Sequence, residues 1–245
     1  MSLQFPAGSI ILSVGTDGSP SMEAQPKIRL DLWYRWLQIG CVHAGQARAA
    51  SAILEPGLPD AGKYSALTSE LQAGLVAITS FAFASDGFYD TVRHELGDHP
   101  GQSIWTTNRL GRYKQVAETL RYHLKLGTKP SLQLRTILEE LFRLRSRAVH
   151  PSRKFVAPNY RPQIDSAIHP YLITFSGPHS VQCRALALGL LDRLLETAQS
   201  AAEKDADGAW IDRGRQEVDR LSAQYRVAGD DQLAFLTGVP STPSP

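Results

Sequence analysis

The segment Arg145-Ser-Arg-Ala-Val-His150 holds two side chains with complementary chemistry. The imidazole of His150 gains or loses a proton near neutral pH, whereas the guanidinium of Arg145 keeps its charge and can bind two phosphate oxygens at once. RNA cleavage without a metal needs one group that moves the 2′-hydroxyl or leaving-group proton and another that holds the phosphate. Arg145 and His150 are therefore candidate catalytic residues.

Two neighbouring residues extend this candidate site. Ser146 can donate a hydrogen bond, and we count it with the catalytic residues. Arg147 lies three residues before His150, so the two are close on a helix surface, and Arg147 is a candidate second phosphate ligand. Pro151 ends the helix at His150, where the negative end of the helix dipole favours the charged imidazole.

The spacing sets a geometric condition on the site. Residues five apart on a helix point about 140° away from each other. Arg145 and His150 therefore converge only if the chain turns back at Pro151, or if a two-fold homodimer forms a shared cleft to which each chain contributes both residues.

A local excess of positive charge surrounds the motif. From Arg109 to Arg161 the chain has thirteen Lys and Arg against three Glu, although its overall net charge is only +2. A positive surface attracts phosphate polymers. The residues that we expect to contact RNA are Arg147, Arg112, Lys114, Arg153 and Lys154. The alternative is a set of solvated helix faces whose charges are balanced by acidic neighbours.

Helical periodicity predicts the elements that must position these residues. The predicted helices run from about 30 to 54, 64 to 96, 110 to 126, 131 to 149, 180 to 204 and 209 to 225. Strands are expected at 9–14 and 171–175, and these two could pair. The fold class is therefore all-α, with a bundle of four to five core helices and irregular extended N-terminal and mid-chain segments.

Several other classes of site find little support in the chain. The sequence from Gly57 to Lys63 has the spacing of a phosphate loop, but Tyr64 replaces the expected Ser or Thr and the loop follows a predicted helix. No histidine has a metal-ligand spacing, although His94 and His99 lie five apart, and we expect no metal and no cofactor. Cys41 and Cys183 fall in apolar helical patterns typical of reduced core thiols.

The predicted location is the cytoplasm. The first residues have no basic region before Ile10-Ile-Leu, and that apolar run is too short for a signal peptide. The most apolar stretch, residues 71–88, is interrupted by polar residues, so we expect no membrane span.

The sequence Glu139-Glu-Leu-Phe-Arg-Leu-Arg145-Ser-Arg-Ala-Val-His150-Pro151 resembles the signature helix of the HEPN superfamily. In that family an Arg, usually a polar residue such as Asn, and four to six residues precede a His. The helix containing residues 77–89, the His169-Pro170 pair and the helix from Ser180 are also similar to uncharacterised bacterial members. The resemblance covers roughly residues 64–198. It implies a HEPN-like domain at 28–205, after an extended segment at 1–27 and before a C-terminal helical extension at 206–240 and a disordered tail at 241–245.

The resemblance implies a helical bundle, often a homodimer, with Arg145 and His150 facing a composite cleft. Many members are metal-independent endoribonucleases of toxin–antitoxin, abortive-infection or other antiphage systems, and others are inactive RNA-binding or assembly modules. We expect an endoribonuclease with His150 as general acid/base, Arg145 on the phosphate, and an antitoxin or defence protein as a further partner. Ser146 stands where active members usually have Asn, Asp or His, which favours the alternative of an inactive RNA-binding or protein-interaction module. A third possibility is a scaffold without nucleic-acid contact, in which the positive segment faces acidic regions of its own fold.

Overall fold

The computed structural model describes residues 10–14, 20–24, 31–151, 154–202 and 208–225. They belong to two compact units that divide between Leu32 and Trp33, and each unit is described by itself. The predicted tail at 241–245 and Arg153 lie outside the described residues.

The N-terminal unit contains one antiparallel hairpin. Strand β1 (Ile10–Val14) pairs with β2 (Pro20–Ala24), with Ile10 opposite Ala24 and Val14 opposite Pro20. The predicted first strand is thus confirmed, but its predicted partner is wrong, because residues 171–175 do not form a strand. A partner close along the chain needs only a short loop, and closing a short loop costs less entropy than closing a long one.

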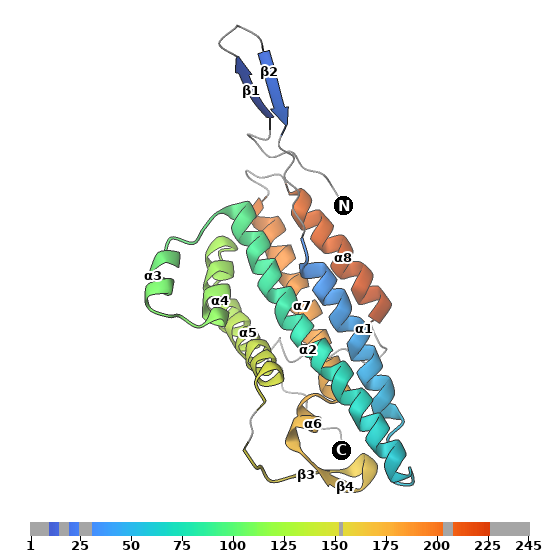
Figure 1. Ribbon diagram of the computed structural model, residues 1–245. Coiled ribbons are helices and arrows are strands. Elements are labelled where there is room, and N and C mark those ends of the chain that lie inside the picture. Colours follow the sequence, from blue (N-terminus) through green and yellow to red (C-terminus); the bar gives the residue numbers. More distant parts are fainter. Residues whose placement is uncertain (1–9, 15–19, 25–30, 152–153, 203–207, 226–245) are drawn as a thin grey trace. The chain divides into compact units, whose positions relative to one another are not determined.

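The second unit is mostly helical, which confirms the all-α class. Figure 1 shows the longest helix, α2, running through the middle, with α1 and α8 on one side and α4 and α5 on the other. The long helices are α1 (Trp33–Ala52), α2 (Asp60–Leu96), α4 (Arg112–His123), α5 (Thr128–Val149), α7 (Gly177–Ala202) and α8 (Ala209–Tyr225).

Helix α2 forms the centre of the core because its apolar residues cover most of its circumference. Ala77, Ile78, Phe81, Ala84 and Phe88 are fully buried, and the helix contacts α1, α4, α5 and α7. Among the described residues it is the one helix whose length and composition would also suit a membrane span. Half of its most apolar stretch is buried within the bundle. We therefore interpret α2 as a core helix.

Helix α8 belongs to the same core as the other helices. Trp210, Ile211, Val218 and Leu221 are buried in the main apolar cluster, and the Trp210 ring centroid lies 6.2 Å from that of Phe88 on α2. The predicted C-terminal extension thus packs directly on the bundle.

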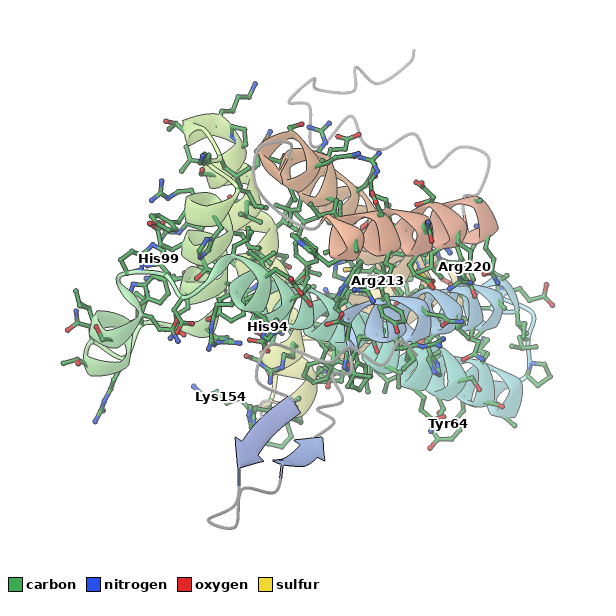
Figure 2. All side chains as sticks on the ribbon, turned by 90° about the horizontal axis from the view of Figure 1, so that it is seen from above. Tyr64, His94, His99, Lys154, Arg213 and Arg220 are labelled. Atoms are coloured by element: carbon green, nitrogen blue, oxygen red, sulfur yellow. The ribbon has the colours of Figure 1, made fainter. Side chains whose placement is uncertain are left out.

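Several helices start a few residues away from the predicted positions, and one short helix was not predicted. Helix α2 begins at Asp60, directly after Pro59, whose fixed backbone angle suits a helix start. It therefore includes Gly62 and Lys63 of the phosphate-loop-like sequence, and Tyr64 is exposed on it (Figure 2). Helix α7 begins at Gly177, three residues earlier than expected, and the short helix α3 (Gln102–Thr107) was not predicted.

The mid-chain segment is more regular than predicted. Strands β3 (Asn159–Arg161) and β4 (Ser166–Ile168) form an antiparallel hairpin around a 3-10 turn at Pro162–Ile164, and α6 (Pro170–Thr174) follows. Figure 1 shows this hairpin and α6 together near the end of α5.

A buried ion pair attaches this hairpin to the bundle. The guanidinium of Arg161 donates to both carboxylate oxygens of Glu70 on α2, at 2.6 and 2.9 Å, and to the Ser51 hydroxyl at 3.2 Å. The main-chain N–H of Gly177 donates to the same carboxylate at 2.8 Å. Glu70 and Arg161 are almost completely buried. The carboxylate therefore joins α2, β3 and the start of α7 at one point.

Candidate active site

Helix α5 ends at Val149 and His150 is its C-cap, as the sequence predicts. His150 leaves helical geometry with φ −124° and ψ 70°, and its main-chain N–H donates to the Ser146 carbonyl oxygen at 2.9 Å. The His150 side chain is exposed. The imidazole is thus presented to solvent at the carboxyl-terminal end of α5.

A groove of about 500 Å³ lies between the end of α5, the segment after it and the start of α6. Its polar and charged lining comes from Arg147, His150, Lys154, His169 and Tyr171, and prolines, Val156 and Leu172 complete its walls. None of the described residues that line it is acidic. A groove lined by two imidazoles, an arginine and a lysine is suited to a phosphate group.

Tyr171 holds the two sides of this groove together. Its hydroxyl lies within hydrogen-bonding reach of the carbonyl oxygens of Ala148 and Arg147, at 3.3 and 3.4 Å, near the end of α5. Its main-chain N–H donates to Nδ1 of His169 at 3.0 Å. Burial raises the pKa of Tyr171 more than the nearby Arg147 lowers it, so the phenol stays a donor at neutral pH. Tyr171 thereby links the helix end that carries His150 to the helix start that carries His169.

We expect Tyr171→Phe to lower the free energy of unfolding by about 1 kcal/mol, since it removes hydrogen bonds while keeping the ring. It should also shift the NMR signals of the His150 and His169 rings, because α6 loses its attachment to α5. Tyr160→Phe is the matched control, since its hydroxyl binds the exposed Asp165 and it does not line the groove. Unchanged histidine signals in Tyr171→Phe would contradict the linking role.

Arg145 lies outside this groove. Its guanidinium carbon is 5.0 Å from the ring centroid of Phe83 on α2, and its Nε is buried with no hydrogen-bond partner among the described residues. Ser146 is exposed and does not line the groove either. Within one protomer, Arg145 and His150 therefore have separate surroundings, as their spacing on a helix requires. Of the motif's two arginines, Arg147 is the one that shares the groove with His150.

The other predicted RNA-contacting residues are dispersed. Arg112 donates to Asp86 at 2.7 Å and lies 4.4 Å from the Tyr89 ring centroid, so it fastens α4 to α2. Lys114 lines a second groove of about 410 Å³, between α4 and the start of α5. Lys154 is in the groove beside His150, and Arg153 is not described.

The excess of positive charge is partly balanced within the fold. Arg121 pairs with Glu118, Arg143 with Glu140, and Arg161 with Glu70. The alternative of charges balanced by acidic neighbours thus applies to these arginines and to Arg112. Arg147 also lies close enough to Glu140 to help lower the pKa of that carboxyl.

The sequence analysis missed His169 and Tyr171 as site residues. His169 is the N-cap of α6, with φ −61° and ψ 133°, and Pro170 occupies the first turn. A polar residue before a proline is a recognised helix-start pattern. That pattern could have placed both residues on a helix, where the β-branched and aromatic composition of 171–175 instead suggested a strand.

His99 and the two cysteines serve packing. His99 stacks on Trp105 at 4.5 Å between ring centroids, its Nδ1 accepts from the Gly101 N–H, and it lies near α3 (Figure 2). Within the described ranges, no three His, Cys, Asp or Glu gather as metal ligands. Cys41 and Cys183 are free and buried, and burial raises the pKa of each thiol to about 12. Such thiols are unreactive.

No protein-family profile, curated protein or solved structure matches this chain. The likeness to the HEPN superfamily thus rests on the residues of the motif and its neighbouring helices.

Proposed function

We propose that the chain is a metal-independent endoribonuclease of HEPN type that cleaves RNA in the groove at the end of α5. The observation that carries the proposal is the grouping of His150, Arg147, Lys154 and His169 around one groove. Each of these side chains can bind a phosphodiester or move a proton beside it.

The reaction follows from what each group can do. His150 takes the proton of the 2′-hydroxyl, the 2′-oxygen forms a bond to phosphorus, and the bond from phosphorus to the 5′-oxygen breaks. The departing 5′-oxygen takes a proton from water, and His150 returns its proton to solvent. The products are a 2′,3′-cyclic phosphate and a 5′-hydroxyl. Arg147 and Lys154 stabilise the negative charge on the non-bridging oxygens.

Arg145 would take part in cleavage only if the protein dimerises. A two-fold homodimer that packs the Arg145 face of one chain near the groove of another would form the shared cleft that the resemblance implies. A role in a cytoplasmic toxin or antiphage defence system, with an antitoxin or defence protein as partner, belongs to the same proposal.

A second candidate function is an inactive RNA-binding or protein-interaction module. Two observations favour it: Ser146 stands where active members have Asn, Asp or His, and Arg145 contacts Phe83 on α2 instead of lining the groove. Such a module would use Arg147 and Lys154 for RNA, with the strong salt dependence of phosphate contacts.

The decisive experiment incubates RNA with EDTA and compares the wild type with His150→Ala. We expect His150→Ala to lower the cleavage rate by about 10²–10⁴-fold, the usual contribution of a general acid/base. His94→Ala is the matched control, an exposed histidine on α2 outside the groove, and it should cleave at the wild-type rate. Equal cleavage by His150→Ala would show that the site is assigned wrongly, and RNA binding without cleavage by the wild type would support the second candidate.

Two further variants identify the phosphate ligand. If the groove of a single chain is sufficient, Arg147→Met slows cleavage strongly and Arg145→Met does so weakly. The reverse order, together with a dimer in sedimentation measurements, would show that the active cleft forms between two chains.

A further inference from the structure

We infer that His169 is a phosphate-binding residue that presents a neutral Nε2–H to the groove, which leaves His150 as the proton acceptor. The inference deepens the proposed function and rests on it for the identity of the substrate. It assigns different roles to two histidines that share one groove.

The protonation of His169 follows from its cap. Nδ1 accepts the main-chain N–H of Tyr171 at 3.0 Å, and a ring nitrogen that accepts a hydrogen bond carries no proton. The proton of the neutral ring is therefore on Nε2. If Nδ1 also carried a proton, it would be a second donor facing the Tyr171 N–H, and the hydrogen bond that caps α6 would be lost.

The Nε2–H of His169 shares its groove with cations that can hold an anionic ligand. His169 is exposed and lines the groove with Arg147 and Lys154, so its remaining nitrogen is available to a ligand held by those cations. A neutral imidazole with a fixed N–H stabilises developing negative charge without losing its own proton. The nearest chemical fit is a non-bridging oxygen of the phosphodiester.

His150 has no comparable constraint. It caps α5 through its main-chain N–H, so the cap uses neither nitrogen of its ring. The other charged and titratable groups that line the groove are Arg147 from α5, Lys154 from the following segment, and His169 and Tyr171 at α6. Of these, the two cations, the capped histidine and the half-buried phenol are unsuited to accepting the 2′-hydroxyl proton.

This division of roles predicts the shape of the pH profile. The cleavage rate should rise with pH as the proposed base is deprotonated and then level off, because the role proposed for His169 is to donate a hydrogen bond and not to transfer a proton. Two histidines acting as base and acid would give a bell-shaped profile instead.

The first test reads the tautomer directly and does not depend on RNA cleavage. Long-range ¹H–¹⁵N correlation of the full chain with ¹⁵N-labelled histidine, assigned with His169→Gln, should show His169 protonated at Nε2 and not at Nδ1 at neutral pH. Inorganic phosphate should shift the His169 Nε2 signal. A proton on Nδ1, or no response to phosphate, would overturn the inference.

The second test separates the cap from the donor. Both Asn and Ser can cap a helix, but only Asn also keeps an N–H donor. We expect His169→Ser to slow cleavage about 100-fold, the scale of losing one preorganised donor, and His169→Asn to stay within a few-fold of the wild type. Wild-type activity in His169→Ser, or a bell-shaped wild-type profile with both variants inactive, would refute the donor role. If the wild type leaves RNA intact while the tautomer and phosphate shift are as expected, the proposed function fails and the donor assignment stands.

Discussion

Arg161→Met is expected to lower the free energy of unfolding by about 3–5 kcal/mol, because it leaves the Glu70 carboxylate buried without its cation. Arg161 supplies two of the bonds to that carboxylate, at 2.6 and 2.9 Å. The Gly177 N–H also donates to this carboxylate, but a neutral amide cannot neutralise a full charge. Urea denaturation followed by circular dichroism measures the loss.

Arg143→Met is the matched control for this experiment. Arg143 pairs with Glu140 one turn away on α5, both side chains are about half exposed, and such pairs contribute less than about 1 kcal/mol. The double variant Glu70→Leu/Arg161→Met should recover part of the stability that Arg161→Met loses, since no buried charge remains. Equal losses in Arg161→Met and Arg143→Met would show that the buried pair is not essential to the fold.

The consequence of this variant extends to the groove. Arg161 ends β3, and β4 runs directly toward His169. A hairpin released from Glu70 loses its attachment to α2, so His169 should become mobile. Cleavage by Arg161→Met, measured well below its unfolding transition, should therefore fall more than cleavage by the control.

Gly74→Ala is expected to destabilise the protein by about 3 kcal/mol, the upper end of ordinary overpacking. A Cβ at Gly74 would lie 1.9 Å from the Phe175 carbonyl oxygen and 2.8 Å from its carbonyl carbon. These are main-chain atoms between α6 and α7, so they cannot move aside by changing a rotamer. The change must instead separate α2 from the α6–α7 junction.

Gly45→Ala should raise the free energy of unfolding, whereas Gly74→Ala lowers it. Gly45 also lies inside a helix, α1, but a Cβ there would meet nothing within 4 Å. Alanine is the better helix former, so we expect a gain of about 0.5–1 kcal/mol in the free energy of unfolding. Thermal and urea unfolding of the two variants side by side measure both effects. A neutral Gly74→Ala would show that α2 does not pass so close to Phe175.

Helices with local start and stop signals were predictable from the sequence. Helix α8 has the predicted bounds, and α5 ends where Pro151 requires. The same local reasoning failed at α6, since the strand propensity of Tyr171–Phe175 competes with the helix start made by His169 and Pro170. The cap and the packing of the Tyr171 ring on Phe175, 4.7 Å between centroids, favour the helix.

Only the part of the candidate site that lies on α5 itself could be predicted from the sequence. The sequence places His150 at the end of α5 beside Arg147, and 3.6-residue periodicity already separates Arg145 from it. The rest of the site, at β3, β4 and α6, depends on contacts between residues far apart in the sequence. The bond between Glu70 and Arg161 spans 91 residues, and Tyr171 reaches the end of α5 across the β3–β4 hairpin. No local pattern encodes such pairings.

The Glu70 carboxylate also bears on when the protein becomes complete during translation. Its cation lies at residue 161 and a further donor at residue 177, so a nascent chain cannot complete the bonds to this carboxylate until both have left the ribosome. Until then the chain carries His150 without the hairpin and α6 fixed opposite it. A nascent chain is surrounded by ribosomal RNA and by its own messenger RNA. For the proposed ribonuclease, the active groove would therefore be assembled only after most of that messenger RNA had been translated.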